Sequence, residues 1–91
     1  MVAAHAAVTS DSAVKAANGQ LVAVSLTAGD AAAATLILYD NASAASGTVL
    51  VSLKAAQGET VSFTPVYPYS AANGIYADIG GSGAAATVVY I

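Results

Sequence analysis

The side chains best suited to acid–base chemistry are five carboxylates and one histidine. Two carboxylates can act as the acid and the base of glycoside hydrolysis, and a histidine acts as a general base where a partner group and a pocket hold it. Most of these carboxylates flank expected turns, where aspartate caps its own backbone, and His5 stands close to the first residue of the chain. The carboxylates are Asp11, Asp30, Asp40, Glu59 and Asp78. We therefore expect no catalytic residue and no enzymatic activity.

The segment Gly80-Gly81-Ser82-Gly83 contains fragments of two functional motifs. A nucleophile elbow has the pattern G-x-S-x-G between a strand and a helix, and a phosphate-binding loop is followed by a helix and carries a lysine. The residues that follow, 84–89, form a β-type run without lysine. We interpret 80–83 as a hairpin turn and expect no cofactor.

Metal and nucleic-acid binding are disfavoured by residue content. The chain has no cysteine, which excludes thiolate zinc sites and disulfides. Asp40-Asn41 alone provides too few oxygens for calcium, so we expect no metal site. The only cationic side chains are Lys15 and Lys54, and the net charge is −3. Because phosphate neutralisation by lysine and arginine provides much of the affinity for nucleic acids, we expect no nucleic-acid partner.

Three tyrosines near Asn73 form the cluster that most favours recognition: Tyr67, Tyr69 and Tyr76. Tyrosine combines a large apolar ring with a polar tip, and so it is frequent at interfaces. Three interpretations stay open at this point. The tyrosines contact a protein partner, they cover one end of the core, or they bind a sugar or another ligand.

Short β-strands are the elements that must position these residues. Apolar and polar residues alternate in short runs that are bounded by turn residues, at the spacing typical of a sandwich or barrel. The segment 36–39 is apolar on both faces, which indicates a strand that is covered on both sides and makes Ile37 and Tyr39 candidate interface residues. We expect an all-β fold, a small antiparallel β-sandwich of about six to seven strands, with a jelly roll or a barrel as topological variants. The clearest expected strands are 20–27, 35–39, 48–54, 60–64, 75–79 and 87–91.

Residues 1–19 have weaker periodicity and end at Asn18-Gly19, before the β-sandwich domain expected for 20–91. They form either an N-terminal arm or an extra strand. As an arm, they would lay Val2, Val8 and Val14 on a neighbouring subunit by strand addition. The sequence shows no signal-peptide pattern and no apolar run approaching the ~18 residues of a membrane span. We therefore expect synthesis in the cytoplasm and no membrane partner.

The composition indicates a surface that other protein partly covers. Hydrophobic residues make up 57% of the chain and charged residues only 8%, whereas soluble domains carry about 25% charged residues. Charge normally keeps the surface of a free monomer soluble. We therefore expect a homo-oligomer or a subunit of a larger assembly.

Three segments give the chain a more specific resemblance: Leu38-Tyr39-Asp40-Asn41, Ser46-Gly47-Thr48-Val49-Leu50 and Asn73-Gly74-Ile75-Tyr76-Ala77-Asp78-Ile79. Together with the glycine-rich turn at 80–83, they resemble the small head decoration, or cement, proteins of tailed bacteriophages over residues 20–91. The resemblance implies a structural protein of the virion that binds the outside of the assembled capsid, with the major capsid protein and further copies of itself as partners. The alternative is a receptor- or carbohydrate-binding module of a virion fibre or tail.

Overall fold

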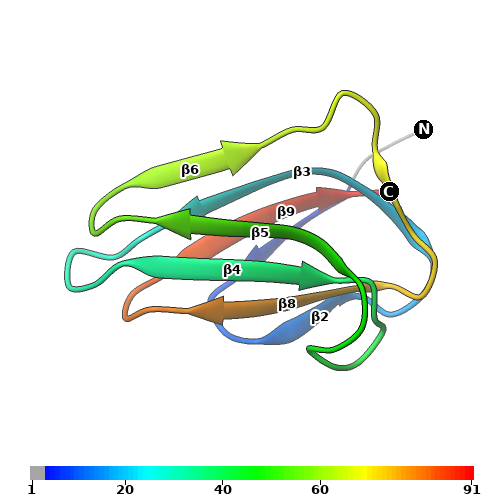
Figure 1. The fold of residues 1–91 in the computed structure, drawn as a ribbon, viewed down its shortest axis with the longest axis horizontal. Coiled ribbons are helices and arrows are strands. Elements are labelled where there is room, and N and C mark those ends of the chain that lie inside the picture. The colour runs from blue at the N-terminus through cyan, green and yellow to red at the C-terminus, as the bar shows by residue number, and fades with distance from the viewer. Residues whose placement is uncertain (1–3) are drawn as a thin grey trace.

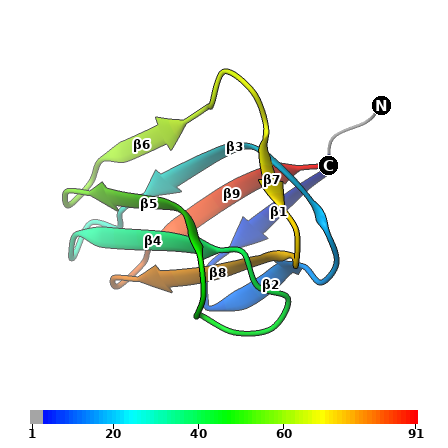
Figure 2. The same ribbon diagram turned by 45° about the vertical axis from the view of Figure 1, so that its right-hand side comes forward.

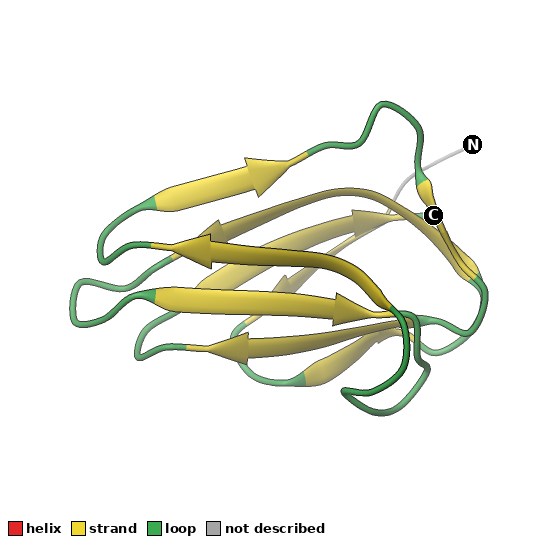
Figure 3. Ribbon diagram, viewed as in Figure 1, coloured by secondary structure: helices red, strands yellow, loops and turns green. Residues whose placement is uncertain are grey.

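The computed structural model describes residues 4–91, and all the regular structure in that range is β-strand (Figures 1 and 3). The first five strands are β1 (Ala4–Val8), β2 (Ser12–Lys15), β3 (Gly19–Thr27), β4 (Ala34–Tyr39) and β5 (Val49–Ala55). The other four are β6 (Thr60–Phe63), β7 (Tyr69–Ala71), β8 (Ile75–Gly80) and β9 (Ala85–Tyr90). The all-β prediction is confirmed, with more strands than the six or seven expected.

The strands form two antiparallel sheets that pack face to face. Sheet A has the order β1-β9-β3-β6, with β7 also paired to β3, and sheet B has the order β2-β8-β4-β5. β6 and β7 pair with the same edge of β3, opposite β9, and so act as two halves of one interrupted edge strand. With those halves counted as one strand, the order is that of an eight-stranded, double-sheet jelly roll.

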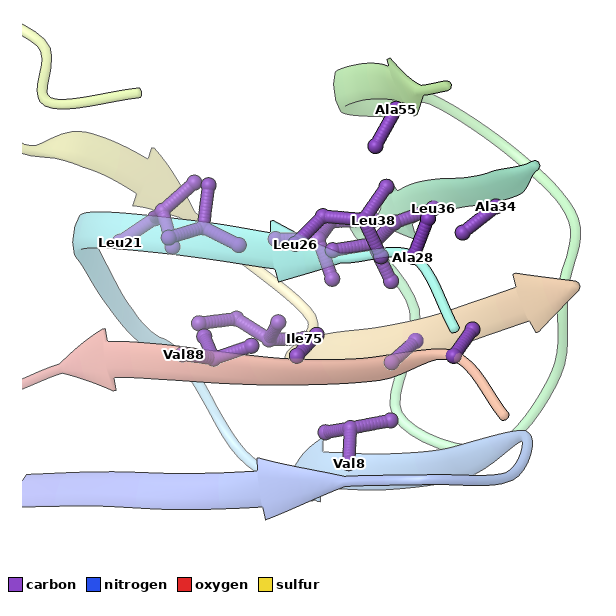
Figure 4. Close-up of a cluster of buried hydrophobic side chains, with 14 of the residues drawn as sticks. Val8, Leu21, Leu26, Ala28, Ala34, Leu36, Leu38, Ala55, Ile75 and Val88 are labelled. Carbon is purple, nitrogen blue, oxygen red and sulfur yellow. The ribbon is translucent and has the colours of Figure 1, made fainter. Parts of the chain in front are cut away.

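The core lies between the two inner faces and follows the alternation of each strand. Leu36 and Leu38 of β4 point inward from sheet B, and Leu26 of β3 and Val88 of β9 point inward from sheet A (Figure 4). Small alanines, among them Ala28, occupy further buried positions of the cluster. Among residues 4–91 no polar or charged residue is buried, so apolar burial and the backbone ladders hold the sheets together.

Two tight turns carry the chain from one sheet to the other, and one of them, at 80–83, is the turn that the sequence suggested as a hairpin. The turn at 56–59 links β5 of sheet B to β6 of sheet A, and the turn at 80–83 links β8 of sheet B to β9 of sheet A. Gly81 has a φ of +111°, and a Cβ there would collide with the carbonyl oxygen of Ala33. Glycine is therefore required where this crossing passes close to the start of β4.

The terminal segment is part of the sandwich. β1 pairs with β9 from Ala4↔Tyr90 to Val8↔Ala86, and β2 pairs with β8 (Figure 2). The side chain of Val8 is 2% exposed and belongs to the core. For residues 4–15 the extra-strand alternative therefore describes the structure, and an arm reaching to a neighbour does not.

Candidate protein-binding surfaces

The first candidate surface is the 64–68 loop, which interrupts the edge strand between β6 and β7. Two of its residues, Pro65 and Pro68, have no N–H to donate to a ladder. β6 pairs with Val24–Thr27 and β7 with Gly19–Leu21, so the loop leaves the sheet opposite the middle of β3. Because proline fixes φ, the loop is held away from the sheet in a restricted conformation.

This loop carries the most exposed large apolar side chains among residues 4–91. Val66 is 91% exposed and Tyr67 80%, and Tyr69, the first residue of β7, is 40% exposed. An open hollow of about 490 Å³ is lined by the seven consecutive residues 63–69. At its base the rings of Phe63 and Tyr69 are tilted against each other, with their centroids 5.7 Å apart. The loop therefore presents an apolar tip on an aromatic base.

The second candidate surface is the outer face of sheet B. Ile75 and Ala77 point into the core, so Tyr76 between them points outward. Tyr76 lies directly opposite Tyr39 of β4, which in turn lies opposite Val49 of β5. Ile37 lies two residues before Tyr39 on the same face. Tyr76, Tyr39, Val49 and Ile37 form one apolar patch, in which Val49 is 50% exposed and the other three side chains are half-buried.

The structure thus divides the predicted interface residues into separate groups. Tyr67 and Tyr69 lie on the 64–68 loop and at its end, whereas Tyr76 does not line the hollow and lies on the sheet B face with Ile37 and Tyr39. Val14 is half-buried and packs against the core.

Val8 and Asn73 belong to neither of the two candidate surfaces. Val8 lies inside the core, which corrects its assignment as a side chain that contacts a neighbour. Val2 lies outside the described residues. The backbone N–H of Asn73, the polar neighbour of the predicted tyrosine cluster, donates to Asp40 Oδ1 at 2.8 Å, and this bond ties the turn before β8 to the end of β4.

Val66 and Val49 are exposed apolar residues that sequence reasoning did not single out. Val66 stands one residue after Pro65 and two before Pro68, a spacing that marks it as part of a turned-out loop. Simple alternation groups Val49 on one face with Val51 and Leu53, but the register of β5 against β4 shifts between Val51 and Val49, so Val49 lies opposite Tyr39 on the outer face.

Asp11 and Asp78 lie side by side at the border of the sheet B face. The Ile79 N–H donates to Asp11 Oδ1 at 2.8 Å. Burial raises the pKa of Asp78, and the neighbouring charge of Asp11 and a hydrogen bond with it raise that pKa further. Such carboxylate pairs occur in acid–base sites, but this pair lies on the outside of a sheet, and the hollow at 63–69 does not contain it.

Within the described range, no group of side chains supports metal binding, and no helix supports a membrane span. Between residues 4 and 91 no three histidine, aspartate or glutamate side chains are grouped so that they could hold a metal ion. The same range contains no helix of the length and hydrophobicity needed to cross a membrane. Compared with protein-family models, curated proteins and solved structures, the chain gives no significant match.

Proposed function

We propose that this protein is a structural component of a phage virion that binds and stabilises the assembled capsid. The observation that carries the proposal is the 64–68 loop, which exposes Val66 and Tyr67 on a proline-bounded support. Two further features support it: the resemblance of residues 20–91 to head decoration proteins, and the jelly-roll order, which recurs in viral capsid domains.

The loop has the properties of an interface anchor. Tyrosine is enriched among the residues that dominate binding energy, and a loop restricted by two prolines loses little conformational freedom on docking. A protein that binds only the assembled shell stabilises that shell by mass action. No chemical step is needed, and the apolar tip would fill a depression between capsid subunits.

The alternative function is carbohydrate or receptor recognition at a fibre or tail. Lectins also use jelly rolls, and Tyr67 and Tyr69 offer rings for stacking. However, the residues that line the hollow include no charged side chain and no side-chain amide. Specific ligand sites place a few polar groups among apolar ones. Here the side chains offer only the hydroxyls of Thr64, Tyr67 and Tyr69, so the loop favours an apolar protein contact over a sugar.

The test is a binding measurement on purified particles that lack this protein. The double variant Val66→Ser/Tyr67→Ser should bind such particles at least roughly tenfold more weakly, because the loss of one anchor tyrosine costs about 2 kcal/mol or more. The control is Ala7→Ser, which replaces an exposed apolar residue on another strand and should bind like the wild type. A mass-spectrometric inventory of intact virions should find the protein in many copies.

Two results would contradict the proposal. Unchanged affinity of the double variant, with an unchanged melting temperature, would show that the loop is not the contact. A few copies per particle, located on the tail, would favour the fibre alternative.

A further inference from the structure

The outer face of sheet B has an apolar centre that no other strand of the described chain covers. Tyr76, Tyr39 and Val49 form one cross-strand row over β8, β4 and β5, and Ile37 continues the patch along β4. Cross-strand neighbours on one face lie close enough for their side chains to touch, so these residues form a continuous surface.

Opposite charges lie at opposite edges of this patch. Lys54 is exposed on the edge strand β5, in the row that contains Thr35 and Gly80. Asp78 lies on β8 opposite Ile37, with Asp11 beside it at the β2 edge. The other lysine of the chain, Lys15, holds its ammonium 5.9 Å from the centroid of the Tyr90 ring, on the side of sheet A.

This arrangement of charge is self-complementary under a two-fold rotation. An axis that runs parallel to β4, above the outer face, would place β5 of each copy over β8 of the other, as in an isologous interface. Tyr76 of one copy would then meet Val49 of the second, and Lys54 would lie above Gly80, which has no side chain, next to Asp78. Both contacts would occur twice. We propose that the outer face of sheet B is the interface of a homodimer.

Sheet B contributes four strands of four to seven residues to this face. At about 3.4 Å per residue and 4.8 Å between strands, its flat area is roughly 400 Å², so the dimer interface lies at the small end of specific interfaces, below the standard size of about 800 Å² per partner. Two packed sheet faces are a frequent arrangement in β proteins.

The dimer would leave the 64–68 loop accessible. That loop belongs to the edge of sheet A, formed by β6 and β7, whereas the proposed dimer uses sheet B. The inference therefore goes beyond the proposed function and does not depend on it: loss of dimerisation and loss of particle binding can be measured separately on different variants.

The test exploits the proximity of Lys54 in one copy to Asp78 in the other. Sedimentation velocity of the wild type at micromolar concentration should show a species of twice the chain mass of 8.8 kDa. Lys54→Glu would place two acids together in the dimer, and Asp78→Lys would place two lysines together, so each variant alone should dissociate at least roughly tenfold more readily.

An equimolar mixture of the two variants should recover dimers. In a mixed dimer, the glutamate introduced at position 54 of one copy faces the lysine introduced at position 78 of the other. The second contact keeps the original Lys54 and Asp78. Both contacts are therefore attractive, whereas each variant paired with itself has two repulsive ones.

The same experiment includes controls that separate loss of dimerisation from loss of folding. Lys54 is exposed and Asp78 lies on the outer face, so both variants should keep the wild-type circular dichroism spectrum. Ala7→Ser, on sheet A, should dimerise like the wild type. A monomeric wild type at high micromolar concentration would overturn the proposal. So would single variants that stay dimeric, or a mixture of the two variants that stays monomeric.

Discussion

At the scale of single residues, the Asp11–Asp78 pair shows how a strand position determines titration behaviour. Ser12↔Ala77 and Ala13↔Tyr76 are paired across β2 and β8, so the next position brings Asp11 beside Asp78. Asp11 accepts the backbone N–H of Ile79. Burial raises the pKa of Asp78, and the charge of Asp11 and its hydrogen bond raise it further, so the proton of Asp78 is held more tightly than that of a free aspartate.

This pair predicts that Asp78→Asn makes stability less dependent on pH. The pKa of Asp78 is raised above its ordinary value of 3.8, so between that value and the raised pKa the folded state binds more protons than the unfolded chain. The free energy of unfolding therefore falls as pH rises through this window. Asparagine cannot ionise, and the variant should lose this fall and melt higher than the wild type at pH 7.

Thermal melting at pH 4 and pH 7 would check this prediction. The comparison is best made in the Lys54→Glu background, which removes the proposed dimer from the measurement. Asp30→Asn, in the loop between β3 and β4, removes one carboxylate without touching the pair and should keep the wild-type pH dependence. If Asp78→Asn melts lower than its parent at pH 7, the two carboxylates stabilise the fold by another interaction.

At the scale of elements, two patterns identified strands: alternation with strong side-chain contrast, and a continuous apolar run bounded by turn residues. Strands with neither pattern were missed. The predicted segments 20–27, 35–39 and 75–79 agree with β3, β4 and β8 within one residue at each end. β1 contains three alanines and one histidine among its five residues, and alanine contrasts little with either face. β7 has only three residues, too few to show alternation. Pro68, directly before it, indicated a loop instead of a strand.

The pairing of β1 and β2 predicts that deleting residues 1–16 destabilises the whole sandwich. The deletion removes Val8 from the core and leaves β9 and β8 as new, unprotected sheet edges, which favour aggregation. We expect a large fall in melting temperature or insoluble protein. His5→Ser changes an exposed residue of β1 and should melt like the wild type. A truncated protein that melts within a few degrees of the full chain would mean that these strands contribute little.

At the scale of the whole molecule, local sequence patterns reveal strands but not their partners. In a jelly roll most successive strands belong to opposite sheets, and here β4–β5 is the sequence-adjacent pair that forms a hairpin in sheet B. The turn residues at 56–59 and 80–83 fit both a hairpin within one sheet and a connection between the two sheets. The sequence alone therefore does not distinguish these two arrangements. For the same reason, the sequence grouped Tyr76 with Tyr67 and Tyr69, which are its neighbours in the chain. In the structure Tyr76 lies opposite Tyr39, a residue far earlier in the chain.

This topology predicts slow refolding for a protein of 91 residues. Strand β1 pairs with the last strand, β9, and β3 pairs with β6, β7 and β9, so most of each sheet forms only after long segments of chain have closed. Loop closure costs entropy before these contacts stabilise the fold, and all-β domains with such pairings fold in roughly milliseconds to seconds. Stopped-flow circular dichroism after dilution from denaturant should show a main phase in that range. A main phase in microseconds would be incompatible with these non-local pairings as the rate-limiting contacts.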